Sequence, residues 1–152
     1  MRALIQRVKR GSVTIDGKLK AEIGRGFVIL VGVGRGDDSS DVAYLARKTA
    51  GLRILSDDEG KLNLSVKDTD AELLVISQFT LYANCKRGNR PSFEQAAPPD
   101  IANDLYEQYI AALRAEGLKV STGTFQADML VNIENDGPVT IMLESPAKGE
   151  QK

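Results

Sequence analysis

The stretch Phe27-Val28-Ile29-Leu30-Val31-Gly32-Val33 is a continuous apolar run rich in β-branched residues. Such a run predicts a strand that is buried on both faces, because a strand with one face in water alternates apolar and polar residues. Leu73-Leu74-Val75-Ile76 has the same character and predicts a second buried strand. We therefore expect both runs in the interior of a sheet.

Further strands are predicted on either side of these two runs. Residues 4–8 begin a strand, and residues 12–17 alternate before they stop at a turn dipeptide, which predicts a hairpin. Near the other end of the chain, residues 129–133 and 139–143 predict two more strands. We expect Asn135-Asp136-Gly137 to be the turn that joins this second pair.

Two helices are predicted between the strands. The first begins near Ser39 and Ser40, whose hydroxyls are suitable N-caps. Its apolar face is formed by Val42, Leu45, Ala46, Thr49 and Leu52. The second helix opens at residues 98–100 and ends at Gly117. Its apolar face is formed by Ile101, Leu105, Tyr109 and Leu113, beside a half-exposed Tyr106.

This order of elements predicts an α+β fold, in which two helices pack against a curved, barrel-like, mostly antiparallel sheet. A chain of 152 residues has the size of a single domain. We place that domain at residues 1–145. Residues 146–152 lack an apolar anchor, and we expect them to form a disordered tail.

Composition narrows the chemistry that the chain can perform. It has no histidine and only one cysteine, Cys85, which excludes the Ser-His-Asp and Cys-His mechanisms and any structural zinc site. An enzyme of this composition has to work with hydroxyls, amides, carboxylates, basic groups or parts of its substrate. We expect no metal and no cofactor.

Charge and hydropathy indicate where the protein acts. The net charge of −1 argues against a general affinity for nucleic acid, so any RNA contact has to come from a local basic patch. The start of the chain is too polar for a signal peptide, and no apolar run approaches the ~18 residues of a membrane span. The lone Cys85 fits a reducing compartment. We therefore expect a cytoplasmic protein with no membrane partner.

Two polar segments are candidates for a reactive site. Ser77-Gln78-Phe79-Thr80 directly follows a buried strand and can present hydroxyls, a side-chain amide and free backbone N–H groups to a cleft. The alternative is a strand end that satisfies its own hydrogen bonds. Asn135-Asp136-Gly137-Pro138-Val139-Thr140 joins a glycine to a proline, and this bond can be cis and turn carbonyls in unusual directions. The alternative there is an ordinary hairpin turn.

Together these segments resemble the two signature motifs of the D-aminoacyl-tRNA deacylases. Ala3-Leu4-Ile5-Gln6-Arg7-Val8 is similar to the opening strand of that family, and residues 88–93 and 122–129 are similar to other family stretches. The likeness runs from about Met1 to Leu143. It implies hydrolysis of the ester bond of D-aminoacyl-tRNA and of mischarged glycyl-tRNA, with rejection of L-amino acids.

The resemblance also implies the layout of the site. The family is homodimeric, and the Gly-Pro motif of one subunit enters the active site of the other with a cis peptide bond. By analogy, Gly137 and Pro138 form a substrate-binding chiral gate opposite the catalytic segment Ser77-Gln78-Phe79-Thr80. The 3′-terminal adenosine of tRNA lies between them, in a pocket to which Phe125 and Met129 are implied to contribute.

Basic residues outside the two motifs each have two interpretations. Lys86, Arg87 and Arg90 form a basic loop, which can hold tRNA phosphates or can be a solvated surface loop. Arg7 matches an arginine of the family's first strand. It either braces the Gly137-Pro138 turn through the backbone or forms a surface salt bridge.

The mechanism has two candidate routes. Backbone N–H groups at residues 77–80 can stabilise the tetrahedral oxyanion. Because the chain has no histidine to accept the proton, either Thr80 is the nucleophile or the 2′-hydroxyl of tRNA helps to activate water, and we favour the second route.

Two rival functions use the same residues differently. A related editing hydrolase would remove a wrong L-amino acid from tRNA and would share the fold. A non-catalytic RNA-binding module is a rival of another class, and the near-neutral charge and the lack of a basic, aromatic face argue against it.

Overall fold

The computed structural model describes residues 1–150 of the chain. The strands are β1 (Arg2–Ile15), β2 (Lys18–Ile23), β3 (Gly26–Gly32), β4 (Leu55–Ser56), β5 (Leu62–Leu64), β6 (Glu72–Ser77), β7 (Lys119–Thr122) and β8 (Leu130–Glu144). The helices are α1 (Ser39–Gly51) and α2 (Pro99–Ala115), together with the 3-10 turns η1 (Val66–Asp68) and η2 (Phe79–Tyr82).

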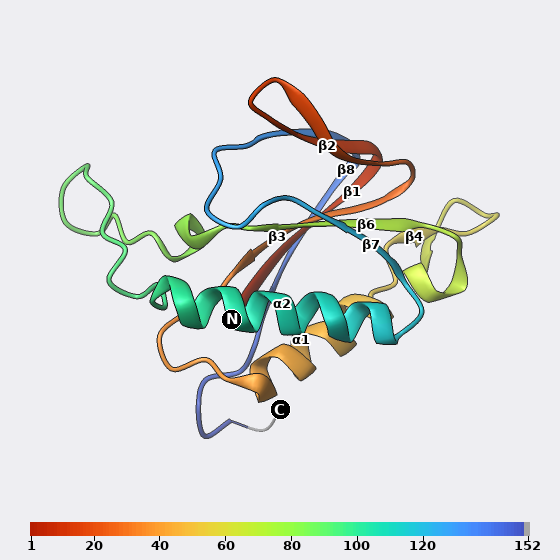
Figure 1. Cartoon of the computed structure of the whole chain (residues 1–152). Helices are drawn as coiled ribbons and strands as arrows, with labels where there is room; N and C mark the ends of the chain where they lie inside the picture. Colours follow the sequence, from red (N-terminus) through yellow and green to blue (C-terminus); the bar gives the residue numbers. More distant parts are fainter. Residues whose placement is uncertain (151–152) are drawn as a thin grey trace.

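Six of these strands form one mixed sheet, in the order β2-β1-β3-β6-β7 with β8 paired to β1. The sheet curls toward a barrel, and α1 and α2 lie together on one side of it (Figure 1). β1 runs antiparallel to β2, β3 and β8, whereas β3, β6 and β7 are parallel to one another. The α+β class with two packed helices is confirmed.

The parallel pairs follow from the position of the helices in the chain. A parallel connection needs a crossover of a dozen or more residues, and α1 and α2 supply the two crossovers that lead from β3 to β6 and from β6 to β7. β3 and β6 are both buried along most of their length, as the two apolar runs predict. These runs form the centre of the sheet.

The predicted turn at residues 135–137 is wrong. Residues 130–144 form the single long strand β8, which pairs along nearly the whole length of β1. Its register changes where Val8 faces Asn135 and Gln6 faces Thr140, so residues 136–139 bulge out opposite Arg7. Asn, Asp and Gly suit a bulge as well as a turn, and the continuous partner strand β1 decides between them.

Helix details also differ from the prediction. The N-cap of α1 is Asp38 and not a serine: its carboxylate accepts from the Ser40 N–H at 2.9 Å, and the Asp41 carboxylate accepts from the Asp38 N–H at 2.8 Å. On α2, Ile101 is 46 % exposed and lies outside the core, whereas Tyr106 is buried instead of half-exposed. Periodicity identifies the inward face of a helix but not how far the neighbouring layer extends over its first turn.

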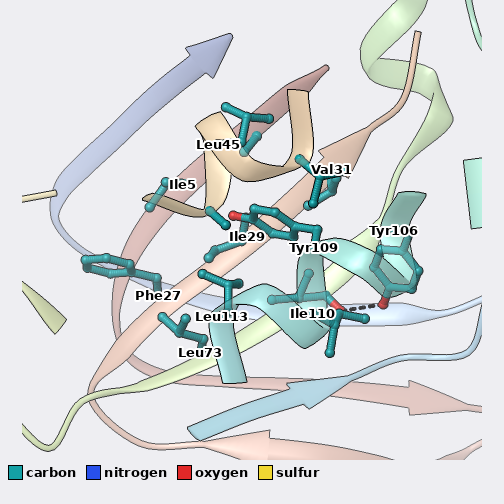
Figure 2. Packing of buried hydrophobic residues seen from close by; sticks show 14 of the residues in the cluster. Ile5, Phe27, Ile29, Val31, Leu45, Leu73, Tyr106, Tyr109, Ile110 and Leu113 are labelled. Atoms are coloured by element: carbon teal, nitrogen blue, oxygen red, sulfur yellow. Dashed lines mark hydrogen bonds between the residues drawn. The ribbon is translucent and has the colours of Figure 1, made fainter. Parts of the chain in front are cut away.

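The core between the helices and the sheet holds two buried tyrosines (Figure 2). The Tyr109 hydroxyl hydrogen bonds to the Thr49 hydroxyl at 2.8 Å, which links α2 to α1. The Tyr106 hydroxyl donates to the Val75 carbonyl at 2.8 Å, which links α2 to β6. Each of these two tyrosine hydroxyls has a partner, so neither imposes the cost of an unsatisfied hydroxyl.

The end of the chain returns to the start of α1. Lys148 Nζ lies 2.9 Å from the Asp38 carboxylate and 2.7 Å from the Asp41 carboxylate. Part of the predicted tail, residues 151–152, lies outside the described residues, and the domain boundary at residue 145 stays a prediction. Among residues 1–150, no helix is long and apolar enough to cross a membrane.

Gly26→Ala should lower the free energy of unfolding more than an alanine substitution at a glycine with open space around it. A Cβ at Gly26 would lie 1.7 Å from the backbone oxygen of Glu72, so β3 and β6 would have to separate locally. We expect a loss of about 3–5 kcal/mol in the free energy of unfolding, measured by urea denaturation. Gly51→Ala is the control, because a Cβ there meets nothing within 4 Å. Equal urea midpoints for the two variants would contradict this reading of the strand contact.

Candidate active site

The first polar segment stands where β6 gives way to η2. The Gln78 N–H donates to the Val31 carbonyl at 2.7 Å, which continues the pairing of β6 with β3 for one residue. The next two backbone N–H groups, of Phe79 and Thr80, begin the 3-10 turn and have no protein acceptor among the described residues. The first N–H groups of a helical turn lack partners within it. Two adjacent donors are therefore available to a ligand.

The side chains of this segment face solvent rather than the core. The Gln78 amide donates to the Thr80 hydroxyl, and the exposed fraction of the Phe79 side chain is 54 %. The Phe79 ring meets the Phe93 ring edge-on, with 5.0 Å between centroids. Thr80 contacts no carboxylate or amine that could act as its base within residues 1–150. The Gln78–Thr80 bond is local to the segment, whereas the Phe79 and Thr80 N–H groups have no protein acceptor within residues 1–150.

Tyr82 is the last residue of η2, the turn that carries Phe79 and Thr80. A Cβ on Gly34 would lie 2.7 Å from its ring, so the ring packs directly on the backbone that follows β3. The Arg2 guanidinium lies 4.5 Å from the centre of the same ring and donates to the Leu81 carbonyl at 2.7 Å. Burial, reinforced by the nearby Asp37 carboxylate, raises the pKa of Tyr82 above its ordinary value. This shift favours the protonated phenol over the phenolate.

The connection that follows β7 reaches the same end of the sheet. β6 and β7 are parallel, with Val75 opposite Thr122, so residues 123–129 begin near Ser77. Phe125 is half-buried beside the Tyr106 ring, 6.2 Å away between centroids. Met129 packs on the opposite side with Ile76, where its sulfur would lie 2.5 Å from a Cβ on Gly123.

The bulge of β8 is held in place by Arg7. The Gly137–Pro138 peptide bond is cis, and Gly137 has φ of +121°. Arg7 is only 9 % exposed; its Nε donates to the Asp136 carbonyl at 3.2 Å, and its Nη1 donates to the Ile54 carbonyl at 2.9 Å. The Asp136 carboxylate lies 3.6 Å from the same Nε. Arg7 therefore contacts the backbone of the bulge from a buried position and also pairs with the partly exposed Asp136 carboxylate.

Within one chain the two motifs do not meet. The bulge lies level with Arg7, which pairs with Phe27, and Phe27 in turn pairs with Leu73. Ser77 is four residues further along β6, or about 13 Å, and three strand spacings add about 14 Å sideways. Gly137 and Ser77 are therefore separated both along the strands and across them.

The basic loop leaves the molecule beside η2. Residues 83–98 extend away from the helices and the sheet (Figure 1) and are closed by a bridge between Asn84 and Ser92. Lys86, Arg87 and Arg90 are all exposed at its tip. Phe93, which the sequence reasoning did not single out, fixes the base of the loop against Phe79. The available signal was its place in residues 88–93, a stretch that resembles the family.

Comparison with known proteins shows which family the chain resembles. The family described as D-Tyr-tRNA(Tyr) deacylase matches residues 4–144. A D-aminoacyl-tRNA deacylase from Heliobacterium modesticaldum is 58% identical over 144 residues, covering 95% of this chain and 96% of that protein. The same enzyme from Thermotoga petrophila is 54% identical over 145 residues, covering 95% and 97%.

Solved structures are similar as well. A structure titled "c-Myc DNA Unwinding Element Binding Protein" superposes with a TM-score of 0.91 at 42% identity, covering 97% of this chain and 100% of that one. A probable eukaryotic D-amino acid tRNA deacylase superposes at 0.79 with 18% identity, covering 94% and 98%, which shows a shared fold.

Sequence relatives and fold together define the class: this is a hydrolase that acts on the ester bond of aminoacylated tRNA. The chain belongs to the D-aminoacyl-tRNA deacylase family.

Proposed function

We propose that the protein works as a homodimer in which each active site is completed across a two-fold axis. The observation that carries this proposal is the separation of the two motifs within one chain. A two-fold axis would bring the Gly137 bulge of one protomer to the Ser77 end of its partner, and the reverse contact would form at the same time. The 15-residue strand β8 supports the idea, because within residues 1–150 it pairs with β1 alone and its other edge is unpaired.

The 3′-terminal adenosine of tRNA would lie between the two motifs. Phe125 lies beside the end of β6 and Met129 packs on the opposite side of the sheet. The Phe125 ring would offer the base a stacking surface, and such stacking is worth ~1–3 kcal/mol. Lys86, Arg87 and Arg90 extend from the same end of the sheet. They would neutralise phosphates of the acceptor stem, in a way that does not depend on sequence.

Hydrolysis would rest on backbone donors and on the substrate. The N–H groups of Phe79 and Thr80 would bind the oxyanion of the tetrahedral intermediate. The Thr80 hydroxyl accepts from the Gln78 amide and has no base beside it, which argues against a nucleophilic role. The 2′-hydroxyl of the terminal ribose is then the group that activates the attacking water.

Chirality would be read by exclusion. A D- and an L-aminoacyl ester carry the same atoms, so a roomy pocket cannot separate them by affinity for the side chain. A fixed backbone wall at Gly137 and Pro138 can, because it would hold the ammonium group and Cα–H while an L-side chain strikes it. The enzyme would accept many D-side chains and also glycine, which has no side chain to clash. We place it in the cytoplasm, where the exposed thiol of Cys85 suits a reducing environment.

The test compares release of D-tyrosine, L-tyrosine and glycine from tRNA at one enzyme concentration. We expect fast release of D-tyrosine, measurable release of glycine and little release of L-tyrosine. Preferential release of L-tyrosine would replace the proposal with the related editing hydrolase. If glycine is released as slowly as L-tyrosine, the exclusion mechanism is wrong, but hydrolysis of D-aminoacyl-tRNA still stands.

Mixed dimers should show whether the site is shared. One chain carries Phe79→Pro, which removes a proposed oxyanion donor at the first position of η2, the other carries Gly137→Val, and each alone should be inactive. After unfolding and refolding as an equal mixture, half of the dimers are mixed and each has one intact site, so we expect about a quarter of wild-type activity. No recovery, or a stable and active monomer in light scattering, would show that each chain holds its own site.

A further inference from the structure

The bulge of β8 interrupts the pairing of that strand with β1. Within residues 1–150, residues 136–139 have no partner residue on β1, and the ladder resumes only at Thr140. Arg7 holds the first half of this interruption through the Asp136 carbonyl. Unpaired backbone moves more easily than a paired strand, so the second half of the bulge needs a contact of its own to keep a fixed shape.

The side chain of Asn135 makes this contact. Its Oδ1 accepts a hydrogen bond from the Val139 N–H at 3.2 Å, and its Nδ2 donates to the Thr140 hydroxyl at 2.8 Å. A backbone N–H can only donate, which fixes the amide oxygen as its acceptor. Gln6 Nε2 lies 3.4 Å from the same Thr140 hydroxyl and ties it to β1. One side chain therefore connects the residue before the bulge to the residues that end it.

Val139 carries this contact to Gly137. A Cβ on Gly137 would lie 2.9 Å from Val139 Cγ2 and 3.0 Å from the Val139 nitrogen, and 3.1 Å from Arg7 Nη2. Gly137 is therefore in close contact both with the residue that Asn135 holds and with Arg7 itself. The Val139 side chain is partly buried and packs on the main core. Because the Val139 N–H is bonded to Asn135, a shift of Val139 away from Gly137 would break that hydrogen bond.

We propose that Asn135 is a positioning residue for the chiral gate. Its amide fixes the far end of the bulge as Arg7 fixes the near end, and both contacts are needed to exclude L-aminoacyl esters. A wall excludes a side chain only to the extent that it cannot move aside. The inference rests on the proposed function, in which Gly137 and Pro138 form that wall. Asn135 itself touches no reacting atom, so hydrolysis of D-aminoacyl esters continues when its amide is removed.

The test measures kcat/KM for D- and L-tyrosyl-tRNA with substitutions at Asn135. Asn135→Ala removes both hydrogen bonds, and we expect the L-ester to react faster, so that the D/L ratio falls roughly tenfold while kcat/KM for the D-ester stays within about threefold. Asn135→Asp should keep most of the ratio, because a carboxylate can accept from the Val139 N–H and from the Thr140 hydroxyl. Asn132→Ala is the matched control: Asn132 is exposed on the same strand and donates to the Ser12 hydroxyl, outside the bulge.

Amide hydrogen exchange, measured by NMR, gives a second readout that does not depend on activity. The Val139 N–H should exchange at least roughly tenfold faster in Asn135→Ala than in wild type, and at nearly the wild-type rate in Asn135→Asp, because its acceptor is lost in the first and kept in the second. The Ile133 N–H, in the paired part of β8, should be unchanged in both variants.

Two results would overturn the inference. One is a wild-type D/L ratio in Asn135→Ala. The other is an equal fall in hydrolysis of both esters together with faster exchange along all of β8, which would indicate a general loosening of the strand. If wild type itself showed no D/L preference, the proposed gate would fail on its own account, and faster exchange confined to Val139 would still show that Asn135 holds the bulge.

Discussion

Arg7→Ala should abolish most of the discrimination between D- and L-aminoacyl-tRNA. A thousandfold preference corresponds to about 4 kcal/mol, and a wall can impose that only if it cannot move aside. Arg7 connects the bulge to the segment after α1, through the carbonyls of Asp136 and Ile54. Hydrogen bonds from a charged donor are worth about 1.5–3 kcal/mol each, so we expect the D/L ratio of kcat/KM to fall roughly a hundredfold.

The measurement is kcat/KM for D- and L-tyrosyl-tRNA with three arginine variants. Arg7→Lys should fall between wild type and Arg7→Ala, because one ammonium group cannot reproduce the spread of a guanidinium. Arg10→Ala is the matched control, because Arg10 lies on the same strand but its guanidinium is exposed and pairs with Glu22, away from the bulge contacts of Arg7. If Arg7→Ala remains folded by circular dichroism and keeps the wild-type D/L ratio, the bulge is not the chiral gate.

A tRNA ending in 2′-deoxyadenosine should be hydrolysed at least about a hundredfold more slowly than the normal substrate. Positioned acid–base groups contribute roughly 10²–10⁴ to the rate, and among residues 1–150 no such group hydrogen bonds to Thr80. Burial favours the protonated phenol of Tyr82, and the sequence has no histidine. The substrate hydroxyl then carries this contribution, and removing it removes the activation of water.

Thr80→Val provides the complementary measurement. It deletes the hydroxyl while keeping the size of the side chain, and it leaves the backbone N–H groups of η2 in place. Single-turnover rates should therefore remain within about tenfold of wild type on normal tRNA, because only a neutral hydrogen bond from Gln78 is lost. Loss of turnover in Thr80→Val together with normal hydrolysis of the deoxy substrate would make Thr80 the nucleophile.

The sequence predicts some elements well because their signals are local. The two apolar runs gave the buried strands β3 and β6, and alternation ending at Asp16-Gly17 gave the hairpin of β1 and β2. The same reasoning misplaced the turn at residues 135–137, since turn-forming residues also suit a bulge. It also left Tyr106 half-exposed, because the periodicity of a helix does not reveal which neighbour will cover its flank.

By itself the sequence determined the chemistry that is possible: no imidazole, a polar strand end after Ile76 and a Gly-Pro pair in a polar stretch. Tertiary structure decided where these parts stand. Pairing of β8 along β1 turned a predicted hairpin into a bulge, and burial of Arg7 turned an ambiguous arginine into a contact with that bulge. The strand order then separated the two motifs within one chain, with β1 and β3 between β8 and β6. Such positions depend on long-range pairing and burial, which no stretch of neighbouring residues encodes.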